Sequence, residues 1–142
     1  MSLLNNNAGA NGHPLACVGH ILPLHPGDFV DAQTDGVHLL TTTVRYEVGR
    51  GVLQELGDAQ IQIRSNKLYT SCHHVALICS AVTGRTVLLN HSPRNGTYMN
   101  SSDIPLSTNT SIRLEDGDII HLGPPCDSYT GSFVYRRIFS DV

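Results

Sequence analysis

The sequence predicts an all-β fold, an antiparallel β-sandwich, and three observations support this prediction. Short apolar runs rich in β-branched residues follow one another along the chain, and clusters of Gly, Pro, Asn, Asp and Ser separate them. The link Glu115-Asp116-Gly117-Asp118 joins two such runs, and its Asp-Gly pair accepts the positive φ angles of a tight hairpin. Helical periodicity is nearly absent. The one candidate turn, Val52 to Leu56, is enclosed by Gly51 and Gly57 and is too short for a stable helix.

The expected elements extend from near the N-terminus to the end of the chain. Residues 1–14 are rich in Asn and Gly and predict a flexible lead-in, so the folded domain is expected at 15–142. The segment Asp28 to Gly36 is polar and predicts a loop. Strands are expected at Leu15 to Leu24, Val37 to Val48, Ala59 to Ile63, His74 to Cys79, Thr86 to Asn90, Gly96 to Asn100, Ser111 to Leu114, Asp118 to Leu122 and Ser132 to Phe139.

Length and composition restrict the classes of protein. The 142 residues suit one domain, and 40% hydrophobic with 15% charged residues is typical of a globular chain. Apolar runs such as Val75 to Cys79 are far shorter than the roughly 20 residues of a membrane span. The net charge of −3 argues against nucleic acid and anionic membranes as partners. Any anion site must therefore be a local cluster of cations.

The cysteines and the N-terminus predict a location inside the cell. Four cysteines, Cys17, Cys72, Cys79 and Cys126, have no C-x-x-C spacing and no dense framework. Met1 to Ala10 is polar and lacks the apolar core of a secretory signal. Free thiols in a reducing compartment follow from both observations, and nucleus and cytoplasm are not distinguished by them.

Three short stretches at expected loop–strand junctions could carry function. Taken singly, Gly49-Arg50 is an ordinary strand exit and Asn95-Gly96-Thr97 an ordinary turn. Ser71 and His74 lie three residues apart without a G-x-S-x-G elbow, which argues against a catalytic triad. Cys72 and its neighbouring histidines lack the paired spacing of zinc ligands. We therefore expect no catalytic residue, no metal and no cofactor.

Together and in this order, the stretches resemble the forkhead-associated (FHA) domain. The resemblance extends over roughly residues 15 to 139, nearly the whole chain. The segments that match the family pattern are Gly49-Arg50, Ser71-Cys72-His73-His74, Asn95-Gly96-Thr97-Tyr98-Met99-Asn100 and Leu114-Glu115-Asp116-Gly117-Asp118-Ile119-Ile120-His121-Leu122-Gly123.

The resemblance implies an eleven-stranded β-sandwich that binds phosphothreonine peptides through loops at one end. It implies that Arg50 binds the phosphate, that Ser71 donates its hydroxyl to a phosphate oxygen, and that Asn95 bonds the peptide main chain. Gly49, His74 and Gly96 are implied to support these loops without touching the ligand. Arginine is suited to this task because its planar guanidinium matches phosphate oxygens. The basic residues in or beside the three loops are Arg50, Arg64, Lys67 and Arg94.

Two positions depart from the family pattern, and a third suggests ligand preference. Arg94 stands where the family commonly has Ser or Thr, and it could bind the phosphate, bind an acidic ligand residue or point to solvent. Cys72 stands where Arg, Lys or Asn is common, and a thiol is only a weak donor. Tyr69 occupies a place that in relatives contacts the third residue after the phosphothreonine, and favours an apolar or aromatic side chain there.

The expected function is phosphothreonine-peptide recognition that mediates phosphorylation-dependent protein–protein interaction. The loop after Leu24 and the region from Asn95 to Leu106 resemble the checkpoint-kinase branch, which implies nuclear signalling in the DNA damage response and cell cycle. One alternative is a phospho-independent scaffold or dimerisation domain of the same fold. A remote alternative is a hydrolase or metalloenzyme. The sequence leaves the partner and the oligomeric state open.

Overall fold

The computed structural model describes residues 17–30, 36–40, 45–51, 59–91, 93–125 and 128–138. The expected lead-in at 1–14, the turn considered at Val52 to Leu56 and Cys126 lie outside these residues. Within them, the chain forms no helix of the length and apolar character that crossing a bilayer requires. All regular secondary structure among the described residues is β-strand.

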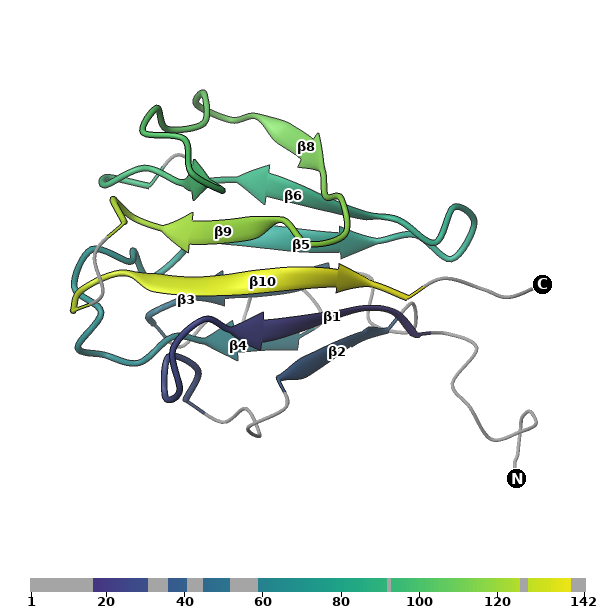
Figure 1. The fold of residues 1–142 in the computed structure, drawn as a ribbon, viewed down its shortest axis with the longest axis horizontal. Helices are drawn as coiled ribbons and strands as arrows, with labels where there is room; N and C mark the ends of the chain where they lie inside the picture. Colours follow the sequence, from purple (N-terminus) through teal and green to yellow (C-terminus); the bar gives the residue numbers. More distant parts are fainter. Residues whose placement is uncertain are drawn as a thin grey trace.

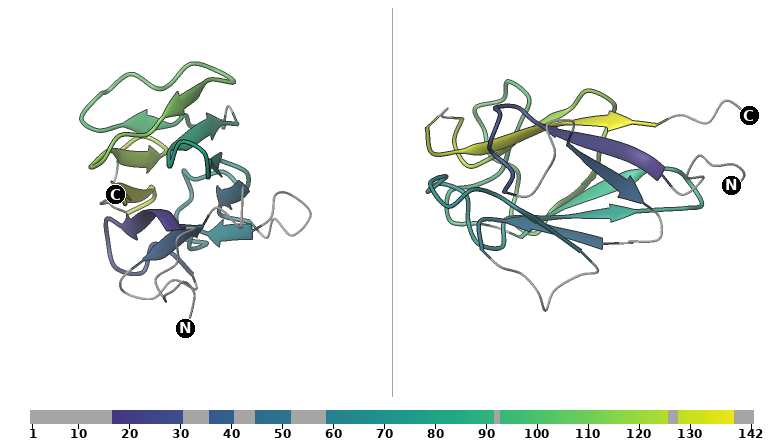
Figure 2. Two further views of the ribbon diagram at one scale, coloured as in Figure 1. Left: turned by 90° about the vertical axis from the view of Figure 1, so that its right-hand side faces the viewer. Right: turned by 90° about the horizontal axis from the view of Figure 1, so that it is seen from below.

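Two five-stranded sheets pack face to face as the two layers of a sandwich (Figure 2). The first sheet has the order β2-β1-β10-β9-β7 and the second the order β4-β3-β5-β6-β8 (Figure 1). The strands are β1 (Cys17–Pro23), β2 (Val37–Leu40), β3 (Arg45–Gly49), β4 (Ala59–Gln62), β5 (Val75–Cys79), β6 (Thr86–Asn90), β7 (Tyr98–Met99), β8 (Ser111–Arg113), β9 (Ile119–Leu122) and β10 (Gly131–Arg137).

The sandwich prediction is confirmed, with differences in strand count and direction. The described residues hold ten strands, where the family resemblance implies eleven. The single expected strand from Val37 to Val48 is two strands, β2 and β3, which lie in different sheets. The expected antiparallel pairing holds except between β3 and β4, which pair in parallel from Tyr46↔Ala59 to Gly49↔Gln62. Sequence alternation does not distinguish a parallel from an antiparallel pair of strands.

The core lies between the sheets and consists of alternate residues from both. Leu77, Leu88, Ile120 and Phe133 are fully buried there, since period-two alternation turns every second side chain inward. Burial of each such side chain contributes about 1.5–3 kcal/mol.

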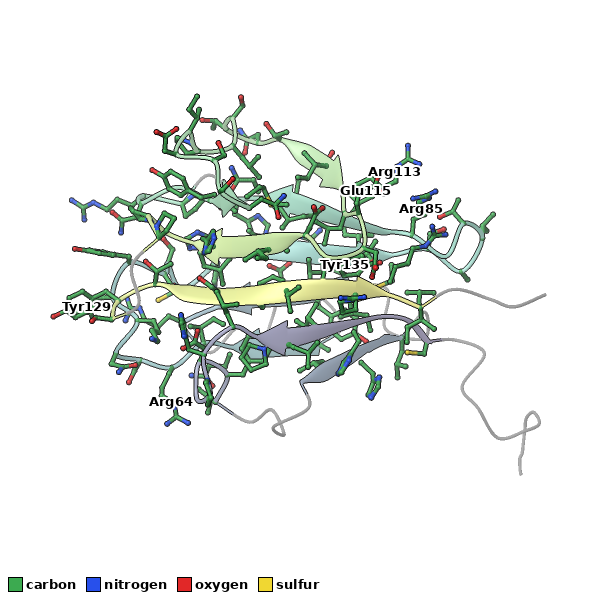
Figure 3. All side chains as sticks on the ribbon, in the orientation of Figure 1. Arg64, Arg85, Arg113, Glu115, Tyr129 and Tyr135 are labelled. Atoms are coloured by element: carbon green, nitrogen blue, oxygen red, sulfur yellow. The ribbon has the colours of Figure 1, made fainter. Side chains whose placement is uncertain are left out.

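Four strands direct their following loops to one end of the sandwich. β3, β4 and β6 run in the same direction within their sheet, and β9 of the facing sheet ends on the same side (Figure 1). The segments that follow them therefore share that end, called here the loop end. Tyr129, in the segment between β9 and β10, marks it in Figure 3, whereas Arg85 and Arg113 lie at the opposite end.

A buried ion pair fixes two loops at this end. Lys67 Nζ lies 3.1 Å from Asp28 Oδ1, and both residues are buried. Asp28 also accepts a hydrogen bond from the backbone N–H of Ser132, at 3.3 Å, so its carboxylate joins segments that are distant in sequence. Lys67 lies beside the three loops, as the sequence places it, and its charge is used in this structural ion pair.

Replacing Lys67 with Met should lower the free energy of unfolding by about 3–5 kcal/mol, because the Asp28 carboxylate would remain buried without its cation. Urea denaturation followed by circular dichroism measures this loss. The exposed Arg113→Ala substitution removes the same charge elsewhere and should change stability by about 0.5 kcal/mol or less. A loss of similar size in both variants would contradict the structural role of the pair.

Candidate functional site

His74 connects the two loops that carry most of the predicted site residues. Its imidazole is fully buried, immediately before β5. Nδ1 accepts a hydrogen bond from the backbone N–H of Ser71 at 2.9 Å, and Nε2 lies 2.8 Å from the carbonyl oxygen of Gly96. The loop before β5 and the loop after β6 are thus held at a fixed separation.

This geometry requires a neutral ring with its proton on Nε2. Nδ1 faces an N–H group and must accept, so Nε2 carries the proton and donates to Gly96. Burial lowers the pKa of His74 from 6.5 to about 4, an effect that the Gly96 carbonyl opposes and nearby His91 reinforces. His74 thus braces two loops through their main-chain atoms, whereas its support of a ligand site stays a prediction.

Arg50 is anchored through Nε, at the base of its guanidinium, and the tip of the group is open. Its Nε donates to the carbonyl oxygen of Thr70 at 2.8 Å, and its backbone N–H donates to Ser71 at 2.9 Å. The side chain is half-buried. Within the described part of the chain, no group accepts a hydrogen bond from its two terminal nitrogens. The two terminal NH2 groups are therefore oriented and available to a ligand.

The loop that carries Ser71 and Cys72 packs directly on the Gly49 strand end. A Cβ at Gly49 would lie 1.9 Å from the carbonyl oxygen of Cys72, so only glycine fits. Gly51 is similarly close, with its ideal Cβ 2.9 Å from Cys72 Cβ. Ser71 is half-buried, Cys72 is exposed, and no described residue bonds the Ser71 hydroxyl. The close approach of the two backbones brings this hydroxyl to the same loop end as Arg50.

Thr70 fastens this loop to the opposite sheet. Its buried hydroxyl donates to the carbonyl oxygen of Leu122 at 2.7 Å and accepts from the backbone N–H of Gly131 at 3.1 Å. The same residue supplies the carbonyl that holds Arg50. The position of the guanidinium therefore depends on contacts to both sheets.

Asn95 joins the second recognition loop to an exposed aromatic pair. Its Nδ2 donates to the carbonyl oxygen of Tyr69 at 3.3 Å. Tyr69 packs edge-on against Tyr129, with ring centroids 5.6 Å apart, and both rings are exposed. Gly123 lies beneath this pair, and a Cβ there would approach Tyr69 Cβ to 2.9 Å. The pair forms an apolar surface beside Asn95.

Buried polar groups below Asn95 shape its loop. Asn90 donates from Nδ2 to the Ser107 carbonyl at 3.1 Å and accepts from the Thr97 hydroxyl at 2.8 Å. Gly96 has φ of +79°, which favours glycine, and its ideal Cβ would lie 3.1 Å from Pro105. This support makes the loop a preformed element.

The structure therefore brings the predicted residues together at one end, with Arg50, Ser71 and Asn95 connected through His74 and Tyr69. Arg94 is exposed beside Asn95. Arg64, by contrast, bonds the Gly27 carbonyl and points outward in Figure 3. Sequence reasoning missed Thr70, Asn90 and Tyr129. Nothing in their local sequence distinguishes the first two from strand residues, whereas the exposure of Tyr129 beside Tyr69 follows only from the fold.

The arrangement suits anion binding rather than bond cleavage. Ser71 contacts His74 through its backbone N–H, and both ring nitrogens are occupied, so the imidazole cannot activate the Ser71 hydroxyl. Among the described residues, no group of three or more His, Cys, Asp or Glu side chains is placed to hold a metal ion. Cys17, Cys72 and Cys79 are free thiols.

Comparison with known proteins gives a consistent family and fold. A family model described as FHA domain matches residues 46–123. The FHA domain of an Arabidopsis thaliana hypothetical protein is 22% identical, covers 96% of this chain and 98% of its own, and has a TM-score of 0.57. The N-terminal FHA domain of S. cerevisiae Rad53p, in complex with a phosphothreonine peptide, is 18% identical with coverages of 85% and 94% and a TM-score of 0.59. The FHA domain of CT664 from Chlamydia trachomatis is 15% identical with coverages of 87% and 99% and a TM-score of 0.59. None of the curated proteins searched matches the chain.

The low pKa of His74 predicts a specific loss of stability in acid. Because the ring takes up a proton at pH 6.5 when unfolded and only near pH 4 when folded, the unfolded state binds more protons between these values. The free energy of unfolding should therefore fall as the pH drops through this window, by about 3 kcal/mol from His74 alone.

His74→Ala is the matched variant. It should be less stable than the parent at pH 7 by about 2–4 kcal/mol, since two hydrogen bonds and a buried ring are lost. Denaturant titrations at pH 7, 5.5 and 4.5 should show a shallower pH dependence in the variant. Equal slopes in both proteins would contradict the buried neutral imidazole.

Proposed function

Because the chain belongs to the FHA domain family, we propose that it is a phosphothreonine-binding module that mediates phosphorylation-dependent protein–protein interactions. The observation that carries the proposal is the open guanidinium of Arg50, held by Thr70 at the same loop end as the Ser71 hydroxyl, which no described residue bonds. A second support is that the fold matches an FHA domain of Rad53p solved with a phosphothreonine peptide.

The chemistry of phosphate fits these two groups. A phosphorylated threonine carries about −1.5 to −2 charges at pH 7 and three acceptor oxygens. Arg50 offers its two terminal NH2 groups as oriented donors, and Ser71 adds a hydroxyl donor. Charge-assisted hydrogen bonds of this kind contribute about 1.5–3 kcal/mol each. Such a site suits a dissociation constant on the order of 1 μM, which phosphatases and kinases can switch.

The groups around the phosphate site are proposed to contact the rest of the peptide. Asn95, with its side-chain oxygen directed to no described donor, would bond the peptide main chain. Tyr69 and Tyr129 would together contact an apolar or aromatic side chain, since their exposed rings form one surface. Cys72, exposed next to Ser71, would contribute only a weak thiol donor. Gly49, His74 and Gly96 would keep the loops in place.

We propose that this recognition takes place inside the cell, in nuclear signalling. The free thiols among the described residues suit a reducing compartment. The resemblance to the checkpoint-kinase branch supports a connection with the DNA damage response and cell cycle.

A phosphothreonine peptide library, titrated beside its unphosphorylated counterpart, tests the proposal. Only the phosphorylated library should bind. Arg50→Ala should weaken its binding by about 2–5 kcal/mol, the cost of removing one partner of a desolvated charge pair. The variant should keep the thermal stability of the parent to within a few degrees. Arg113→Ala, at the far end of the sandwich, is the charge-matched control and should bind like the parent.

Equal binding of phosphorylated and unphosphorylated libraries would overturn the proposal and favour a phospho-independent scaffold. Binding that requires phosphate but tolerates Arg50→Ala would instead assign the phosphate to other groups. Affinity should also fall with added salt, and below about pH 6 as the phosphate loses its second charge.

A further inference from the structure

A surface cleft lies beside the phosphate site, on the far side of Asn95. Its volume is about 450 Å³. We call it the Arg94 cleft; its lining includes Asn90, Arg94, Asn95, Tyr98, Pro105 and Pro124. Asn90 ends β6 and Tyr98 begins β7, and the others lie in the loop after β6, between β7 and β8, and just after β9. Neither Arg50 nor Ser71 lines it, so the cleft is separate from the phosphate groups.

The cleft is formed before any ligand arrives. Asn90, in its floor, bonds both the Ser107 carbonyl and the Thr97 hydroxyl. The backbone N–H of Leu106 donates to the Thr97 carbonyl at 2.8 Å, which ties the two walls together. Because these polar groups already satisfy one another, a ligand need not order the walls.

One positive charge dominates the cleft. Among the described residues that line it, Arg94 alone is charged at neutral pH. It is exposed, and it forms no ion pair or hydrogen bond with any other described residue. The remaining polar lining consists of amides and hydroxyls, which can donate to an anion as well. Tyr98 and the prolines supply apolar walls. The cleft therefore suits a side chain with an apolar stem and an anionic head.

We propose that the Arg94 cleft is a second anion subsite, which takes an aspartate or glutamate side chain flanking the phosphothreonine in the same ligand. The inference rests on the proposed function and deepens it. Asn95 lines the cleft and also bonds the Tyr69 carbonyl beside Ser71, so one peptide crossing Asn95 reaches both sites. Arg94 is then a specificity-determining residue, and its role is distinct from that of Arg50.

The single cation selects a carboxylate over a second phosphate. One guanidinium balances one carboxylate charge, whereas a phosphate carries about −1.5 to −2 charges at pH 7 and would remain partly uncompensated. Glutamate should bind better than aspartate, because its longer stem contacts the apolar walls while its carboxylate reaches Arg94.

The experiment uses peptides selected from the phosphothreonine library and varied one flanking position at a time. Each position carries Glu, Gln, Lys or a second phosphothreonine, and affinity is measured by fluorescence anisotropy. At one position, the parent protein should prefer Glu over Gln by about 3- to 10-fold, a typical scale for a partly exposed charge pair. Arg94→Ala should abolish this preference, and Arg94→Glu should turn it into a preference for Lys. Arg113→Ala, matched in charge change, should leave the preference intact.

The outcomes separate this inference from the proposed function. Binding that requires phosphate and Arg50, with a Glu-to-Gln ratio unchanged by Arg94→Ala at every position, would overturn the subsite alone. A second phosphothreonine that binds more tightly than Glu through Arg94 would overturn its assignment to a carboxylate. Binding that needs neither phosphate nor Arg50 would overturn the proposed function and the subsite with it.

Discussion

The recognition end of this domain depends on one buried, neutral imidazole. His74 accepts from the backbone N–H of Ser71 and donates to the backbone carbonyl of Gly96. Both contacts are to main-chain groups, so the ring sets where two loops lie rather than how their side chains point. A buried ring with both nitrogens satisfied imposes a definite geometry, because any displacement leaves a polar group unpaired in a low-dielectric site.

The charged residues divide into those that hold the fold and those that face solvent. Lys67 forms an ion pair with Asp28, and Arg45 forms one with Glu47. His91 Nε2 lies 2.9 Å from Oε1 of the same Glu47 carboxylate. Arg50 and Arg94 keep their guanidinium tips clear of every described acidic group. A chain with net charge −3 can therefore present a local positive field at one end, because the buried carboxylates Asp28 and Glu47 are already paired with structural cations.

Sequence alone predicts the parts of this structure that depend on local pattern. Alternation located the strands, and the order of the Gly-Arg, Ser-x-x-His and Asn-Gly motifs indicated which loops meet. The division of Val37 to Val48 between two sheets was not predicted, because no Gly or Pro interrupts that run. The pairing of Lys67 with Asp28 and the bonds of Asn90 to Ser107 and Thr97 were also missed. These contacts join segments whose proximity is set by sheet register, which residue spacing does not encode.

Arg50 and Arg94 lie in separate places, and this separation affects which ligands the domain would select. Arg50 is fixed through Thr70 to both sheets, so under the proposed function a phosphate would meet the same donors whatever sequence surrounds it. Discrimination between phosphorylated partners must then come from contacts to the flanking residues, since specificity is a difference between affinities. Arg94 and the Tyr69–Tyr129 pair lie on loops joined to the phosphate site through Asn95 and His74. Because the protein side is preformed, most of the ordering cost falls on the peptide, and a mismatched flanking residue is not relieved by loop rearrangement.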